Sequence, residues 1–455
     1  MGALACVINI ITENAETFQG QQVTLRTGQI EQLYSVEYKI GKKFKDDSGL
    51  YFYTGVARNY GSDEDYSPMD SPYPMTWGYV HDQIGYRDIP KLKFYLDYMN
   101  GPFELWGRYT RGGTRFDRPM RWTVDPWDPT TRDMNLPPDP RYQEMGYQQL
   151  ILATNYTFEV SDKFKVDTSF SYDMFDIELL YGSGVNCSRE DKYMTKLVAK
   201  WNPNEKHSFA FGGSWLREYF GIRSPGYPGK QYWGGIYNPA CLSMIYAGLY
   251  PMPKWTTDTF AVFGEHQWRI NDKWTSFLGF RMDKNTFTQP LWSSRATLIF
   301  TPTDKDTFKV MFSRAVRLNF ASEMYLAAHP QPYWVYDEGL GDWVQMPPPP
   351  GSKTKPEVLY AYELRYERQQ TKNLWLAGSI FFHDHKIKGY SWEGNIQSGT
   401  PVGNMQTYGL EFEGIYKKGK NEIILSHSYT KMYDFDSVRN SAGTGPSDQM
   451  FTSEP

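Results

Sequence analysis

Hydrophobic and polar side chains alternate along most of the chain from about residue 20 onward, in runs as long as a β-strand. Within 163–176, Phe164, Val166 and Phe170 fall on one side of an extended backbone, whereas Lys165 and Asp167 fall on the other. The same period of two recurs near 92–98, 308–313 and 360–367. This period predicts β-strands that each have one apolar and one polar face.

The connections between these predicted strands are of two kinds. Short polar turns occur at 100–102, 160–163, 202–206, 270–273, 302–306, 369–372 and 417–420. Between them lie long links at 60–90, 112–146, 180–189, 220–255, 318–353 and 389–401, with 285–290 as a short exception. In antiparallel order, all the turns come to one end and all the links to the other. A soluble β-sandwich also alternates, but this arrangement of connections favours an outer-membrane barrel.

Composition agrees with a barrel and excludes a helical membrane protein. The 455 residues include 35 Tyr, 27 Phe and 15 Trp, and the mean hydropathy is -0.61. No apolar run approaches the roughly 20 residues that a membrane helix needs. Barrel strands are apolar on one side only and carry aromatic side chains at both membrane interfaces, so low mean hydropathy is expected.

Charge and chemistry exclude several other classes of function. The net charge of -4 gives no basis for nucleic-acid binding. Cys6, Cys187 and Cys241 lie too far apart in the chain for a zinc motif. No catalytic triad order, carboxylate pair or phosphate loop stands out, so we expect neither an enzyme nor a cofactor. The chain starts without a signal peptide, although a barrel must be exported, and we expect the true N-terminus to be missing.

The strand pattern yields about 17 strands between Val23 and Thr430, an odd number that does not close a bacterial barrel. The residues from Asp434 to Pro455 are rich in Ser, Asp and Gly and are typical of a further loop. We therefore expect an all-β, antiparallel transmembrane barrel whose C-terminal strands are missing.

A family resemblance rests on the start of the chain and on a series of weaker features. The run from Gly2 to Thr12 is similar to the stretch that closes the plug domain of TonB-dependent receptors, with Cys6 where that family usually has Gly. Further features follow in the family's order at 261–265, 278–283, 313–317, 355–364 and 404–413. The resemblance implies a barrel of about 22 strands. Residues 1–19 would be the end of a plug that is mostly missing, and residues 20–455 an incomplete barrel.

The same resemblance implies a function. We expect a Gram-negative outer-membrane receptor that takes up a scarce ligand, such as a ferric siderophore or cobalamin, with energy delivered through TonB. The expected partners are the TonB complex, outer-membrane lipid, lipopolysaccharide and a small-molecule ligand such as an iron chelate. The alternatives are a passive porin-like or structural barrel and, from a third class, a soluble all-β binding protein.

Several polar and aromatic residues are candidates for ligand binding. The cations Arg111, Arg115, Arg118 and Arg121 are predicted to share one long loop, where they would meet an anionic ligand, lipopolysaccharide phosphates or water. His383 and His385 are two apart on a predicted strand, so both should face the lumen, either as a ligand or metal pair or as ordinary polar wall residues.

Aromatic loop residues and two cysteines complete the candidates. Tyr232, Trp233 and Trp334 could stack on a ligand or anchor loops on one another. Cys187 and Cys241 are predicted in two loops at the same end of the barrel, where a disulfide between them is plausible. For the barrel wall, the pattern places Phe94, Phe164, Phe170, Phe308 and Tyr362 outside, and Lys165, Asp167, Lys309, Glu363 and Arg365 in the lumen.

Overall fold

The computed structural model consists of β-strands joined by turns and links. It describes residues 12–29, 33–45, 47–59, 90–116, 143–181, 184–222, 255–317, 356–389 and 400–437, together with a hairpin at 333–337 and 342–347 and a few single positions near it. In this described part, no helix has the length and apolar character needed to cross a membrane.

The main sheet contains 17 strands, which confirms the predicted all-β fold and the strand number. Their alternation of apolar and polar residues is what allows each strand to have one face toward lipid. The strands are β1 (Gly20–Gly28), β2 (Leu33–Lys45), β3 (Ser48–Asn59), β4 (Lys91–Asn100), β5 (Phe103–Phe116), β6 (Gln143–Ser161), β7 (Phe164–Tyr181), β8 (Gly184–Asn204), β9 (His207–Ile222), β10 (Trp255–Arg269), β11 (Trp274–Asn285), β12 (Leu291–Thr303), β13 (Asp306–Arg317), β16 (Glu357–Thr371), β17 (Leu374–Gly389), β18 (Thr400–Lys418) and β19 (Asn421–Ser437).

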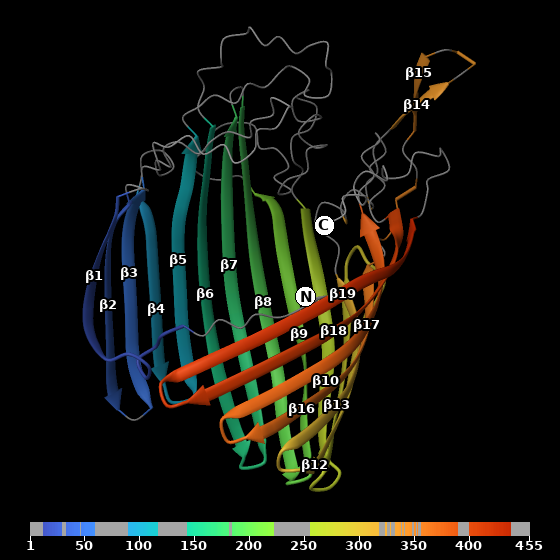
Figure 1. The fold of residues 1–455 in the computed structure, drawn as a ribbon. Helices are drawn as coiled ribbons and strands as arrows, with labels where there is room; N and C mark the ends of the chain where they lie inside the picture. Colours follow the sequence, from blue (N-terminus) through green and yellow to red (C-terminus); the bar gives the residue numbers. More distant parts are fainter. Residues whose placement is uncertain are drawn as a thin grey trace.

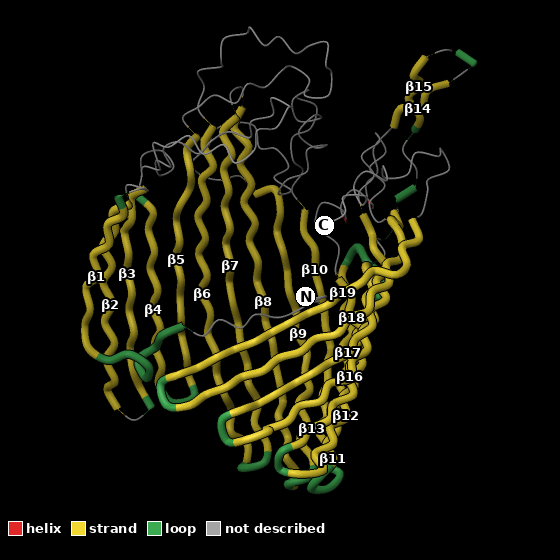
Figure 2. Tube along the Cα trace, viewed as in Figure 1, coloured by secondary structure: helices red, strands yellow, loops and turns green. Residues whose placement is uncertain are grey.

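Each strand of this sheet pairs antiparallel with the next one along the chain, and β13 pairs directly with β16. The separate hairpin β14 (Tyr333–Asp337) and β15 (Asp342–Met346) lies in the link between them. The sheet curves round so that the late strands face the early ones across an interior space (Figure 1). The short turns gather at one end of the sheet (Figure 2), as the sequence predicts.

The two faces of the sheet differ in chemistry. Alternate residues form an outer face on which large apolar side chains are exposed, such as Val310 at 55% and Leu298 at 38%. The opposite, concave face carries ion pairs, for example between Lys309 and Glu367. For ten residues the sequence predicts whether the side chain faces outward or into the lumen. The register places all ten on the predicted face. The outer face is therefore suited to lipid and the concave face to water.

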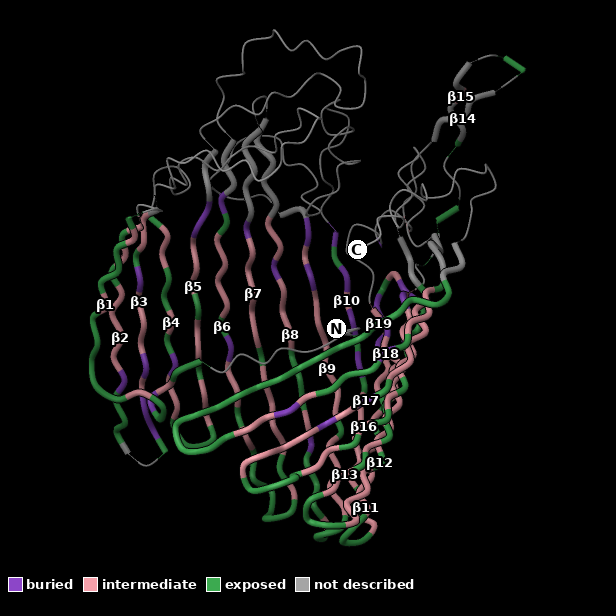
Figure 3. The backbone as a smooth tube through the Cα atoms, viewed as in Figure 1, coloured by how far each residue is buried: buried purple, intermediate pink, exposed green. Residues whose placement is uncertain are grey.

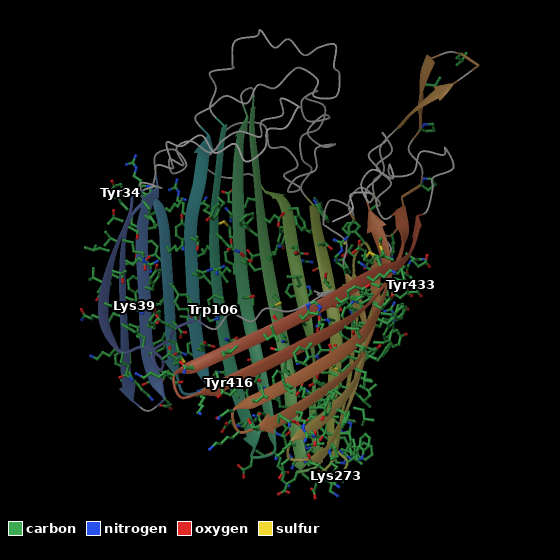
Figure 4. All side chains as sticks on the ribbon, viewed as in Figure 1. Tyr34, Lys39, Trp106, Lys273, Tyr416 and Tyr433 are labelled. Atoms are coloured by element: carbon green, nitrogen blue, oxygen red, sulfur yellow. The ribbon has the colours of Figure 1, made fainter. Side chains whose placement is uncertain are left out.

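The two ends of the sheet also differ. Figure 4 labels Tyr34 and Tyr433 near the ends of strands that lead into the links, and Lys273 and Tyr416 near the turns. The end of the sheet that carries the links is called the loop end, and the end that carries the short turns is called the turn end. At the loop end, the short link between β11 and β12 is held by Asn285, whose amide nitrogen donates to the hydroxyls of Thr257 and Thr259 at 2.7 and 2.8 Å. At the sheet edge, β19 is exposed along most of its described length (Figure 3).

Several strands continue further than the sequence predicts. Arg111 and Arg115 were expected in a long loop, but both lie within β5, which stays paired with β6 as far as Phe116 and Gln143. Cys187 was also expected in a loop, but it lies within β8 and is in register with Glu178. These placements were wrong because backbone pairing continues past the last clear apolar and polar alternation.

Candidate functional site

The concave face, or lumen wall, of β13, β16, β17 and β18 carries a connected set of charged side chains. Glu367 accepts hydrogen bonds from Lys309 Nζ and Arg365 Nε, each at 2.7 Å. Arg365 also donates to Glu413 at 3.3 Å, and the hydroxyl of Ser379 donates to Glu411 at 3.3 Å. Each cation of this group is held by a carboxylate, so the wall is braced across neighbouring strands.

His383 and His385 lie on this same lumen wall, as predicted. Along β17 they alternate with the outward residues Phe382 and Asp384. The His383 ring contacts Phe381, with 4.9 Å between the ring centroids. The Nε2 atom of His385 is 3.9 Å from a carboxylate oxygen of Glu357, which Arg317 also binds. Among the described residues no group of three metal-ligating side chains occurs, and the role of this pair in ligand binding stays a prediction.

The opposite part of the lumen wall holds a docked segment, residues 12–18, that leads into β1. The carboxylate of Glu13 accepts hydrogen bonds from Lys39 Nζ at 2.8 Å and from the Tyr51 hydroxyl at 2.8 Å. Thr12 and Tyr95 are joined through their hydroxyl oxygens, which are 3.0 Å apart. Because β2, β3 and β4 all contribute, the segment is fixed to the wall at several points.

Packing reinforces these polar contacts. Ala15 is only 2% exposed, and a Cβ at Gly49 would lie 2.6 Å from the Ala15 Cβ. The Phe18 ring packs edge-on against Tyr51 at 6.1 Å and beneath Lys39 Nζ at 4.1 Å. Glycine in a strand interior marks such a close approach of another backbone.

A turn within the segment sets its shape. The side-chain oxygen of Asn14 accepts from the backbone N–H groups of Glu16 and Thr17, both at 3.0 Å. The backbone N–H of Phe18 donates to the carbonyl of Asn14 at 3.0 Å. Asn commonly forms this kind of local turn because its short side chain reaches the backbone two or three residues on.

A pocket of about 400 Å³ lies beside the docked segment on the lumen wall. Lys39, labelled in Figure 4, is one of its lining residues. The cations that line the pocket are Arg26, Lys39, Lys93 and Arg108, and the acidic residues that line it are Glu13 and Glu37. Two of these cations are already compensated, since Arg26 pairs with Glu37 and Lys39 with Glu13. The remaining positive charge would favour an anionic group in this part of the lumen.

The docked segment is expected to loosen in acid. Hydrogen bonds from Lys39 and Tyr51 hold the pKa of Glu13 below its ordinary value of 4.5. Because the pKa of Glu13 is lower in the docked state than in the undocked state, ionised Glu13 stabilises docking. This stabilisation is fully present at pH values above the ordinary pKa and is lost as the pH falls through the lowered pKa. Since Glu13 is half-exposed, hydrogen-exchange protection of the Phe18 amide should fall by no more than about fivefold. The variant E13Q should show no such pH dependence; an equal dependence in E13Q would contradict this assignment.

The remaining sequence candidates are placed as follows. Trp334 lies in β14, within the separate hairpin. Tyr232, Trp233, Arg118, Arg121 and Cys241 lie outside the described residues. The ligand role of all these residues, and the disulfide between Cys187 and Cys241, stay predictions.

Sequence reasoning missed the docked segment and its partners. The signals that could have found it were Asn14 three residues before Thr17, which is typical of a local turn, and the glycines Gly41 and Gly49 inside strands. Neither signal says which wall the segment would contact, because that depends on tertiary packing.

The fold and its polar lumen define the class of a large outer-membrane-type barrel, and the family follows from a sequence comparison. The family model described as TonB dependent receptor-like, beta-barrel matches residues 93–452. The chain therefore belongs to the TonB-dependent receptor family. Its members and structural neighbours are transport receptors and not enzymes. In a comparison with curated protein sequences, no match was found.

Solved structures show the same fold at low sequence identity. One is a variant of the ferric enterobactin receptor PfeA from Pseudomonas aeruginosa, with a TM-score of 0.57 and 12% identity, covering 90% of this chain and 61% of that one. The siderophore receptor PirA from Acinetobacter baumannii has a TM-score of 0.57 and 13% identity over 91% and 61% of the two chains. The FrpB iron transporter from Neisseria meningitidis has a TM-score of 0.58 and 14% identity over 91% and 63%. The chain thus spans less than two thirds of their length.

Proposed function

We propose that this chain forms the barrel wall of a Gram-negative outer-membrane receptor that takes up a scarce small molecule, with a ferric siderophore as the first candidate and cobalamin as the second. The observation that carries the proposal is the family match over residues 93–452. The neighbouring structures include receptors whose names state ferric enterobactin or siderophores. The polar lumen wall supplies hydrogen-bonding groups along the path that such a ligand would follow.

The docked segment suggests how the barrel wall is connected to the plug domain. We assign residues 1–19 to the end of a plug domain and residues 20–455 to the barrel. Glu13 and Phe18 then fix the point where plug and wall meet. In this proposal, TonB supplies the energy that displaces the plug. The outer face contacts outer-membrane lipid and lipopolysaccharide, and the loop end of the sheet lies outside the cell.

The test is uptake by the full receptor in a Gram-negative host that lacks its own iron-chelate receptors. Radiolabelled ferric catecholate, ferric hydroxamate and cobalamin would each be supplied at nanomolar concentration. We expect saturable uptake of one of them, at least about tenfold above the host without receptor, and a loss of that uptake when TonB is deleted. Binding to the cell surface should persist without TonB.

The porin-like alternative makes the opposite forecast. A passive barrel would give uptake that does not saturate and that continues when TonB is deleted. That result would overturn the proposal, as would the absence of saturable binding for every ligand in the panel.

A further inference from the structure

Two cations converge on one aromatic ring on the outer face near the loop end. Arg314 of β13 is in register with Tyr360 of β16, and Lys386 of β17 is in register with the neighbouring Val358. The guanidinium carbon of Arg314 and the Nζ of Lys386 both lie 5.8 Å from the centroid of the Tyr360 ring. The Arg314 Nε also donates to the Tyr360 hydroxyl at 3.3 Å.

The charge of this pair is not fully compensated within the described part of the chain. One guanidinium nitrogen of Arg314, NH1, is buried and has no hydrogen-bond partner there. Asp384 lies on the same face in register with Tyr360, but neither Arg314 nor Lys386 forms an ion pair among the described residues. Because Lys386 is exposed, Arg314 is half-buried and neither has a carboxylate partner there, an external anion that reached their exposed atoms would be stabilised by both charges.

Two other outward cations near the loop end, Arg189 and Arg217, differ in this respect. Arg189 is held by both carboxylate oxygens of Asp191, at 2.9 and 3.1 Å. Arg217 is held in the same way by Asp258, at 2.9 Å for each contact. Their charges are compensated by protein carboxylates, whereas the two cations on Tyr360 have no carboxylate partner among the described residues.

An aromatic surface lies next to the cation pair, on the side toward the turn end. Phe312 and Tyr362 pack with 5.2 Å between their ring centroids, and Phe382 is 6.1 Å from Tyr362. All three rings are on the same outer face as Tyr360. A charged group would therefore meet the cations while a connected apolar chain lay over the rings.

We propose that Arg314, Tyr360 and Lys386 bind a phosphate group of a multiply acylated glycolipid, lipopolysaccharide, in the outer leaflet of the outer membrane. Arginine and lysine are the usual partners of phosphate. The aromatic surface of Phe312, Tyr362 and Phe382 contacts the acyl chains. The assignment of this leaflet rests on the proposed function, which places the loop end outside the cell.

The test uses the full receptor purified from outer membranes in detergent and stripped of lipid, with diphosphorylated lipid A as the probe. Native mass spectrometry would measure the bound fraction across a lipid titration. The double variant R314Q/K386Q should bind lipid A about tenfold more weakly, because two charged contacts to phosphate are lost. The single variant K386Q, which changes an exposed side chain, should show a smaller loss of about threefold and keeps the test valid if R314Q fails to fold.

The matched control is K42Q, which removes an exposed outward cation near the turn end of β2 and should leave lipid A binding unchanged. Dephosphorylated lipid A should bind the wild type and the double variant equally. Unchanged lipid A affinity in both K386Q and the double variant would overturn the proposal. Equal competition by phosphatidylglycerol or by inorganic phosphate would overturn the assignment to a glycolipid. Ligand uptake by the same variants is measured separately, so a failure of the proposed transport function would be recognised independently.

Discussion

Replacing Val310 by arginine is expected to destabilise the folded barrel by roughly 2–4 kcal/mol, the cost of a cation on the lipid face near the middle of a membrane. Val310 lies in the middle of β13 and is 55% exposed on the outer face. Its outward neighbours across the sheet are Leu298 and Leu364, so the new charge would have no acid beside it. Unfolding in urea, followed by tryptophan fluorescence in lipid vesicles, measures the change in free energy.

The adjacent residue provides the control. Met311 lies on the lumen wall in register with Glu363, so M311R gives the new cation both water and a carboxylate. We expect M311R to cost much less than V310R. Equal costs for the two variants would contradict the assignment of the faces.

The variant G41A should release the docked segment from the lumen wall. A Cβ at this position would overlap the backbone carbonyl oxygen of Phe18, and a backbone atom cannot move aside without displacing the segment. The segment would then lose the contacts of Glu13 and Phe18 with Lys39 and Tyr51, at a cost of roughly 1–3 kcal/mol. We expect limited proteolysis within residues 12–18 to become at least about tenfold faster, which corresponds to about 1.4 kcal/mol.

The matched control is G264A in β10. There, a Cβ would meet the Phe211 Cβ at 3.8 Å, an ordinary contact. This variant should leave cleavage of the segment unchanged. If G41A also left it unchanged, the docking of Phe18 on Gly41 would not be what holds the segment in place.

The sequence was sufficient to predict the barrel because its strongest signals are local. The alternation of Phe164 and Lys165 defines two faces, and the polar turns at 160–163 and 202–206 mark one end of the strands. Strand ends at the other end were less predictable. Arg111 and Cys187 continue strands through backbone hydrogen bonds, and such bonds do not require an alternating pattern of side chains.

The site was predictable only in part. His383 and His385 alternate along the strand with the outward-facing set that includes Leu374 and Ile380, so the sequence alone was enough to place them in the lumen. The docked segment depends on contacts between Glu13 and residues 26 and 38 positions further along the chain. Such contacts arise from packing and leave only an indirect trace, in this case the glycines that make room for the segment.

The pairing of every strand of the main sheet with its neighbour in sequence has a consequence for how such receptors diversify. A link at the loop end closes a hairpin that is already fixed by its ladder of backbone hydrogen bonds. For connecting loops in general, a doubling of the length costs only about 0.6 kcal/mol in loop-closure entropy. Links such as the one between β9 and β10 can therefore lengthen, shorten or change sequence with little effect on the wall. This tolerance accounts physically for one architecture being shared at 12–14% identity between this chain and each of the structures compared, and it leaves the loops free to adapt to new ligands.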